Sequence, residues 1–167
     1  MSYFNESQLE QSIIALLKEQ GYEYMKGEDI VRNLDEVVLR GDLAEYLHNR
    51  YKNDGITDQE VEAAIRVIMQ QTGGSLYDEN KHTIHLLMDG FSLKREDPAK
   101  QNLYIYPIAF DEANQKHNIF KVVNQYAVEE YGRIRCDMVV FVNALPLVVI
   151  ELKSPSREET DEEDAYT

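Results

Sequence analysis

The stretch RCDMVVFVNALPLVVIELKSP, residues 135–155, holds two runs of apolar and β-branched residues on either side of a short turn. Such runs predict two β-strands, and the short connection predicts that they pair as an antiparallel hairpin. Each run carries a carboxylate near its outer end, Asp137 in the first and Glu151 in the second. Because acidic residues are rarely buried without a partner, these two positions need an explanation.

A three-residue turn, Asn143–Leu145, would place Asp137 directly opposite Glu151, with Lys153 two positions further along the same face. Two opposed carboxylates repel each other, and burial increases this cost unless a cation compensates. Mg²⁺ binds one or two carboxylates and retains waters, and a neighbouring lysine can orient such a water to hydrolyse a phosphodiester. A four-residue turn would break this register, and an exposed Glu–Lys pair on a strand explains the same residues without a metal.

The remaining sequence predicts helices first and strands afterwards. Helical periodicity and cap residues predict helices at 5–20, 42–51 and 58–71. Alternating or β-rich runs predict strands at 103–110, 118–130, 135–142 and 147–153, and a weaker strand at 83–93. This order predicts an α/β fold of α+β-like order, with an antiparallel sheet core covered by helices on both faces. The last strand is apolar on both faces, which indicates burial on two sides.

The composition fits one domain over residues 1–167. The chain has 43% hydrophobic and 29% charged residues and no apolar run near the ~20 residues that span a bilayer. The N-terminus lacks the pattern of a signal peptide, and Cys136 is the single cysteine, so we expect a cytoplasmic protein.

The net charge of −14 is the wrong sign for tight binding to nucleic acid phosphates. The tail 154–167 contributes six acids and one arginine and is interpreted as a solvated segment or a helix start.

The spacing D137-x13-E151-L152-K153 resembles the PD-(D/E)xK nuclease core. The stretches NALPLVVIELK, NIFKVVNQYAV and QLEQSIIALLKEQGYEY more specifically resemble the N-terminal nuclease region of the type I restriction enzyme R subunit. That resemblance covers both ends of the chain, whereas residues 22–100 show no clear match. It implies a restriction-endonuclease-like core, in which a mixed sheet with an antiparallel hairpin is flanked by helices.

The resemblance also implies the site residues. Asp137 and Glu151 would be metal ligands and catalytic residues, Leu152 would offer its backbone carbonyl to Mg²⁺, and Lys153 would be the catalytic lysine. A glutamate on the first helix often joins the metal shell in such nucleases, and Glu10 matches it. Glu10 can equally be a boundary residue that completes the helix cap with Ser7, beside the apolar face Leu9-Ile13-Leu16-Leu17.

Three basic residues near the proposed site, Lys121, Arg133 and Arg135, can meet DNA phosphates, or can serve as cross-strand partners of acidic residues. His82 and His85 have no third ligand nearby, so a surface or packing role is favoured over zinc.

Two features depart from the family pattern. Ala144 stands where the family usually has glycine, so we expect a turn that does not need positive φ. No Q-x-x-x-Y follows the E-L-K strand, which indicates an N-terminal nuclease domain truncated at its C-terminal end, with the ATP-dependent motor region missing.

The function implied is Mg²⁺-dependent cleavage of double-stranded DNA, coupled in the full-length protein to ATP-driven translocation and carried out with the specificity and methyltransferase subunits. The other hypothesis is a nuclease-fold interaction module that docks on a DNA motor without cutting. Intact Asp137, Glu151 and Lys153 favour the enzyme. The DNA sequence recognised cannot be predicted, because another subunit reads it in this family.

Overall fold

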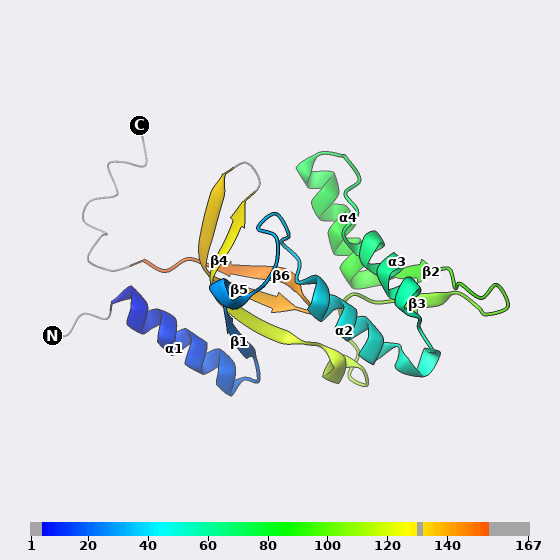
Figure 1. Ribbon diagram of the computed structural model, residues 1–167, viewed down its shortest axis with the longest axis horizontal. Coiled ribbons are helices and arrows are strands. Elements are labelled where there is room, and N and C mark those ends of the chain that lie inside the picture. The colour runs from blue at the N-terminus through cyan, green and yellow to red at the C-terminus, as the bar shows by residue number, and fades with distance from the viewer. Residues whose placement is uncertain (1–4, 130–131, 154–167) are drawn as a thin grey trace. The chain divides into compact units, whose positions relative to one another are not determined.

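The computed structural model describes residues 5–129 and 132–153, which form a mixed α/β architecture (Figure 1). The helices are α1 (Glu6–Glu19), α2 (Arg40–Arg50), α3 (Asp58–Ile68) and α4 (Leu76–Asp89), with short 3₁₀ turns η1 (Gly27–Asp29), η2 (Lys52–Asp54) and η3 (Gln115–His117). The strands are β1 (Glu23–Lys26), β2 (Phe91–Leu93), β3 (Leu103–Ile105), β4 (Phe120–Glu129), β5 (Arg133–Val142) and β6 (Leu145–Ile150). The expected α/β class is confirmed, and the acidic tail 154–167 lies outside the described residues.

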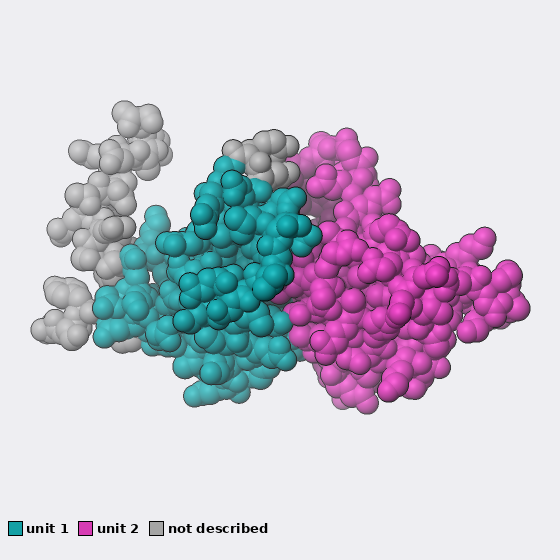
Figure 2. All heavy atoms as spheres, viewed as in Figure 1, with its two compact units in different colours: residues 1–37, 120–141, 146–167 teal, residues 38–119, 142–145 magenta. Residues whose placement is uncertain are grey.

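The chain divides into two compact units, coloured separately in Figure 2. Unit 1 comprises residues 1–37, 120–141 and 146–167, and unit 2 comprises residues 38–119 and 142–145. That the whole chain folds as one domain stays a prediction. No helix in the described part of the chain is long and apolar enough to cross a bilayer.

A four-stranded sheet with the order β1-β4-β5-β6 organises unit 1. β1 runs parallel to β4, with Glu23 opposite Lys121 and Lys26 opposite Asn124. β5 and β6 are neighbours joined by a tight turn, so the predicted hairpin is present in a sheet of mixed direction. β1 was not predicted, because a four-residue strand is too short to show a period.

Helix α1 packs on this sheet through a stripe that agrees only in part with the one predicted. Asn5 caps the helix in a capping box with Gln8, whereas Ser7 lies inside the helix. Ile14 is buried against Val122, Met138 and Val140, and Ile13 and Leu17 pack around this cluster. Leu16, which was expected in the packed face, is 56% exposed.

Glu10 lies four and seven residues before Ile14 and Leu17, so it shares their side of the helix. This is the helix edge on which the sequence placed Glu10, and the structure shows that this edge faces the sheet. Glu10 belongs to the stripe that contacts the sheet.

Away from the α1 cluster, unit 1 has a second packing group formed by an irregular segment. Tyr126 is buried and meets Phe141 edge-on, with ring centroids 5.2 Å apart. The Tyr126 hydroxyl donates to the Val37 carbonyl at 2.9 Å, and the guanidinium of Arg32 stacks 4.0 Å from the ring centroid. Within unit 1, residues 30–37 provide this packing although they form no helix or strand, and the sequence predicted no element there.

The β5–β6 turn consists of two residues, Asn143 and Ala144, with φ of 50° and 72°. Positive φ at both central positions is typical of a type I′ turn, which matches the right-handed twist of a hairpin. The three-residue turn predicted from the sequence is therefore wrong. The expectation that Ala144 would avoid positive φ is also wrong, since alanine occupies the left-handed position despite its Cβ.

The buried side chain of Asn143 explains how this turn is held. Its Nδ2 donates to the Pro107 carbonyl and to Asn118 Oδ1, both at 2.9 Å, and its Oδ1 accepts from the Ile119 backbone N–H at 2.7 Å. The Leu39 N–H donates to the Ala144 carbonyl at 3.2 Å. These contacts lie within unit 2 and compensate the strain, which is of the order of 1–3 kcal/mol for such a backbone.

Strand β6 forms an edge of the described sheet, and the three residues at its middle are exposed. Leu147, Val148 and Val149 are 44%, 49% and 57% exposed, so the prediction of burial on two sides is wrong for the described part of the chain. The strand ends at Ile150, and Glu151 and Lys153 lie just beyond it rather than within it.

Unit 2 is built on the packing of α2 against α3, with a core of Leu43, Tyr46, Leu47, Val61, Ala64 and Ile65. Residues 83–89, expected as part of a strand, belong to α4, which Ser75 caps in a box with Asp78. The apolar run TIHLL is too short for its period to separate helix from strand, and the cap is the better signal. The β2–β3 hairpin completes the unit.

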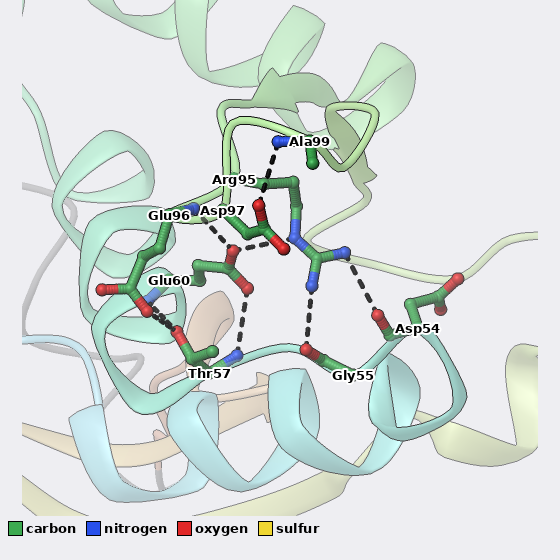
Figure 3. Close-up of polar contacts among 8 residues, drawn as sticks. All are labelled: Asp54, Gly55, Thr57, Glu60, Arg95, Glu96, Asp97 and Ala99. Atoms are coloured by element: carbon green, nitrogen blue, oxygen red, sulfur yellow. Dashed lines mark hydrogen bonds and ion pairs between the residues drawn. The ribbon is translucent and has the colours of Figure 1, made fainter.

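A buried ion pair ties the start of α3 to the loop after β2 (Figure 3). Arg95 Nε donates to Glu60 Oε1 at 2.8 Å, and the two side chains are 5% and 2% exposed. The remaining guanidinium nitrogens donate to the Asp54 and Gly55 carbonyls at 3.1 and 2.8 Å. Backbone N–H groups of Thr57 and Glu96 donate to the Glu60 carboxylate, so both charges of the buried pair are compensated.

We predict that Arg95→Met destabilises the fold by about 3–5 kcal/mol, because it leaves the Glu60 carboxylate buried without its cation. Burial raises the pKa of Glu60, but hydrogen bonds from Arg95 and from backbone N–H groups lower it overall below 4.5. The carboxylate therefore contributes stability that is complete above pH ~4.5 and is lost as pH falls through the lower folded pKa.

Thermal melts from pH 7 to pH 3 measure both effects. The matched control is Arg40→Met, which removes an exposed pair with Glu62 and should cost less than about 1 kcal/mol. Equal losses in the two variants would contradict the role of the buried pair.

Candidate functional site

A hydrogen bond joins Asp137 to the segment that follows β6. The backbone N–H of Leu152 donates to Asp137 Oδ2 at 2.8 Å. Asp137 is half-buried in β5, whereas Glu151 and Lys153, the residues on either side of Leu152, are exposed. The structure therefore brings the Asp137 carboxylate together with the Glu151–Lys153 segment, through a backbone contact that the sequence did not predict.

The pKa of the Cys136 thiol depends on the charges of the neighbouring carboxylates. Burial raises the pKa of Cys136, and the negative charges of Glu151 and then Asp137 raise it further. The effect of Glu151 on the Cys136 pKa fits the two-residue turn. This turn pairs Val142 with Leu145, and in the resulting register Glu151 lies opposite Cys136. The direct opposition of Asp137 and Glu151, expected from a three-residue turn, is replaced by this offset.

Glu10 contacts two consecutive amides of β4. Asn124 Nδ2 donates to Glu10 Oε1 at 2.5 Å, and Gln125 Nε2 donates to Glu10 Oε2 at 3.4 Å. Tyr24 from the neighbouring strand donates its hydroxyl hydrogen to Asn124 Oδ1 at 3.2 Å. The interpretation of Glu10 as part of the helix cap with Ser7 is thus wrong, since its carboxylate is bound to the sheet.

A break in the alternation of β4 makes this contact possible. Gln125 has φ of 51°, whereas successive side chains of a regular strand point to opposite faces. As in a β-bulge, the irregular residue lets two neighbouring side chains, Asn124 and Gln125, reach the same carboxylate. The buried ring of Tyr126 then belongs to the other packing group of unit 1.

The two acids expected to bind a metal have no cluster of further ligands around them in the described residues. No group of three or more His, Cys, Asp or Glu side chains within 5–129 and 132–153 has an arrangement that could hold an ion. The carboxylates of Asp137 and Glu151 fit Mg²⁺, which takes one or two carboxylates and completes its octahedron with water. Glu10 instead satisfies Asn124 and Gln125, and the N–H rather than the carbonyl of Leu152 is engaged by Asp137.

The basic residues named from the sequence separate into two places. Arg133 and Arg135 line a pocket of about 550 Å³ in unit 1, together with Lys26 and Arg32. Lys121 is 6% exposed, lies 3.7 Å from Glu23 Oε2 and does not line this pocket.

Four residues of these sites were not predicted from the sequence, namely Asn124, Gln125, Lys26 and Arg32. A usable signal existed for the first two, because the polar pair NQ interrupts the apolar strand KVVNQYAV. Lys26 and Arg32 carried none, since they join the pocket only through the fold. His85 pairs with Asp89 on α4 at 3.1 Å, in keeping with the expected surface role.

Comparison with known proteins gives one consistent result. The family described as the type I restriction enzyme R protein N terminus matches residues 3–167. The HindI type I restriction enzyme endonuclease subunit of Haemophilus influenzae is 30% identical over 166 residues, which cover 94% of this chain and 16% of that protein.

Two further relatives agree. The SsaAORF53P endonuclease subunit of Staphylococcus saprophyticus is 29% identical over 155 residues, covering 92% of this chain and 15% of that protein. The putative MjaIXP endonuclease subunit of Methanocaldococcus jannaschii is 30% identical over 166 residues, covering 91% and 15%. The chain thus spans about one sixth of the length of these relatives.

We predict that Glu151→Gln lowers the pKa of the Cys136 thiol, because it removes a negative charge that opposes thiolate formation. The rate of alkylation by iodoacetamide, measured from pH 7 to pH 10, should then rise at lower pH than in the original chain. Cys136 is the only cysteine, so the readout is unambiguous. The control Glu112→Gln makes the same charge change in unit 2 and should leave the pH dependence of alkylation unchanged. If Glu151→Gln also left it unchanged, the Glu151 carboxylate would not lie near Cys136.

Proposed function

The chain belongs to the family of type I restriction enzyme R subunit N-terminal regions, and we propose that it is the DNA-cleaving part of such a subunit. In this proposal it has a PD-(D/E)xK core and hydrolyses phosphodiesters of double-stranded DNA with Mg²⁺. Asp137, Glu151 and Lys153 are the catalytic residues. The names of the relatives describe endonuclease subunits, which supports this assignment.

The observation that carries the proposal is the hydrogen bond from the Leu152 N–H to Asp137 Oδ2. It couples an acid of β5 to the short segment that bears Glu151 and Lys153, although these residues lie 14 and 16 positions further along the chain. A carboxylate whose one oxygen accepts a backbone N–H keeps further lone pairs for a metal.

The residues of the chain take distinct roles in this mechanism. Asp137 and Glu151 would hold the ion, and bound Mg²⁺ would supply positive charge to the phosphodiester and lower the pKa of a bound water. Lys153 is exposed and follows Glu151 by two residues, and in this proposal its ammonium orients the attacking water and stabilises negative charge as it develops on the phosphate. Asn124 and Gln125 hold the Glu10 carboxylate on the sheet, and Glu10 enters the metal shell only if these amides release it.

The coverage of the relatives supports a role within a larger protein. We propose that the chain acts as the N-terminal region of a longer cytoplasmic subunit, in which an ATP-driven motor translocates DNA. The partners in this proposal are the specificity and methyltransferase subunits, which would supply recognition of the DNA sequence.

One observation favours the second candidate, a module that does not cut by itself. The described residues do not assemble three metal-ligating side chains, so the chain alone would bind Mg²⁺ weakly. The two functions assign different roles to Lys153. DNA cleavage requires it as a catalytic residue, whereas docking does not require it.

We predict that calorimetry with Mn²⁺ finds a weak site that is lost in Asp137→Asn and in Glu151→Gln. Each carboxylate supplies a hard oxygen, and one alone displaces too little of the water bound to the ion. Glu112→Gln is the matched control for nonspecific binding to an acidic chain and should leave the titration unchanged. Retention of the site in both variants would move the metal to other carboxylates, with the tail 154–167 as the first suspect.

We predict that Lys153→Ala in the full-length subunit abolishes DNA cleavage but leaves ATP hydrolysis and translocation intact. Removal of this kind of catalytic help reduces rates ~10²–10⁴-fold. Because Lys153 is exposed, its replacement should change stability by no more than about 0.5 kcal/mol.

Melting curves and cleavage rates of Lys153→Ala and of the control Lys116→Ala separate catalysis from folding. Normal cleavage by Lys153→Ala, or a large fall in its melting temperature, would rule out the catalytic role.

A further inference from the structure

The pocket of about 550 Å³ in unit 1 concentrates positive charge in a chain whose net charge is −14. Four cationic side chains, Lys26, Arg32, Arg133 and Arg135, line it against a single carboxylate, Glu28. They come from three separate segments, namely the end of β1 with η1, the irregular segment 30–37, and the start of β5. The positive charges gathered in the pocket repel one another, and a bound anion would compensate them.

Contacts within the described residues leave much of this charge uncompensated. The side chains of Arg133 and Arg135 are exposed and form no hydrogen bond or ion pair in the described part of the chain. Lys26 lies 3.7 Å from Glu28 in an exposed pair, and such pairs are worth little. These three cations are therefore available to a ligand.

Arg32 differs from them because it forms part of the wall. Its Nη1 donates to the Asn33 and Glu36 carbonyls at 3.0 and 2.7 Å, and its Nη2 donates to the Ala127 carbonyl. It also stacks on Tyr126, while its Nε is buried without a partner. Arg32 thus fixes segment 30–37 to β4 and adds a positive field to the pocket.

The opposite wall is built by a close approach of two backbones. A Cβ at Gly27 would lie 2.5 Å from the Gln125 carbonyl oxygen and 2.9 Å from that of Asn124, so only glycine fits there. The same Gln125 has positive φ, which shows that the pocket lies where the strand is irregular. Irregular, strained backbone of this kind clusters at binding sites.

We propose that this pocket is a phosphate site for duplex DNA, in which Arg133, Arg135 and Lys26 hold a backbone phosphate away from the one that is cleaved. Arginine suits phosphate because its planar guanidinium donates two parallel hydrogen bonds. Arg133, Arg135 and Asp137 occupy alternate positions of β5, so their side chains follow one face of the strand. A DNA strand bound at Asp137 would continue along this face to the arginines.

The inference rests on the proposed function for the identity of its ligand, and the contact is independent of sequence, since phosphates carry no base information. It also explains how an acidic chain engages DNA. The pocket supplies a local positive charge, and the surrounding acidic residues keep binding weak until other parts of the complex hold the duplex.

The test is fluorescence anisotropy of a labelled 20-base-pair duplex with the chain, in EDTA and at several salt concentrations. Arg133→Gln and Arg135→Gln should weaken binding several-fold, and the slope of log Kd against log salt should fall by about one for each phosphate that is no longer neutralised. Lys116→Gln, an equal charge change on an exposed residue of unit 2, should leave affinity and slope unchanged.

Several results would overturn the proposal. The first is that the original chain does not bind the duplex at low salt. The second is that Lys116→Gln weakens binding as much as the Arg133 and Arg135 variants do. The third is that these arginine variants weaken binding to single-stranded DNA but not to the duplex. Melting curves exclude unfolding, and Arg135→Lys should retain part of the binding because it keeps the charge. The assay contains no metal and measures binding rather than cleavage, so a failure of the proposed nuclease function would leave the pocket result unaffected.

Discussion

The hairpin that carries the candidate site depends on a turn held in a left-handed backbone by one buried asparagine. Asn143 satisfies polar groups of residues 107, 118 and 119, and this set of hydrogen bonds compensates the positive φ of Asn143 and Ala144. With only two residues in the turn, Val142 and Leu145 face each other, and the register of β5 and β6 is set from there. The contact between Asp137 and Leu152 follows from that register.

The second constraint is the irregular backbone at Gln125. Together with the turn, it accounts for the positive-φ residues other than glycine in the described ranges. At Gln125 the irregularity brings two amides to Glu10 and lets Gly27 press against the strand, so one local distortion builds both the Glu10 contact and a wall of the basic pocket. Strain of this kind persists only where surrounding contacts stabilise it. We therefore expect substitutions at Gln125 and at the β5–β6 turn to be poorly tolerated.

The sequence predicted the parts of the fold that rest on local patterns. Strands at 118–130 and 135–142 and helices that begin near residues 5 and 58 come from alternation and cap residues, and these elements are present. The length of the β5–β6 turn was not predicted correctly, because the residues NALP fit both a two-residue and a three-residue turn. A difference of one residue in the turn shifts every cross-strand pair.

Prediction from the sequence also failed where burial depends on partners far along the chain. Leu16 and Ile14 are indistinguishable by period alone, yet only Ile14 is buried. The site was partly predictable for a similar reason. The hairpin sequence indicated Asp137, Glu151 and Lys153 as candidate site residues, and this assignment stays a prediction. The pocket gathers residues from three segments that only the fold brings together.

The exposed edge of the sheet affects how the chain behaves at high concentration. β6 has a neighbour on one side only among the described strands, and no charged residue interrupts LPLVVI. Edge strands in monomeric proteins are normally protected by lysine, proline or a bulge, and within β6 Pro146 near the start of the strand is the only such residue. An unprotected apolar edge accepts another strand readily, so two copies can pair there through backbone hydrogen bonds. The residues that would be covered lie directly before Glu151 and Lys153, so self-association of the chain in concentrated solution would restrict access to the end of the sheet that bears these two proposed site residues.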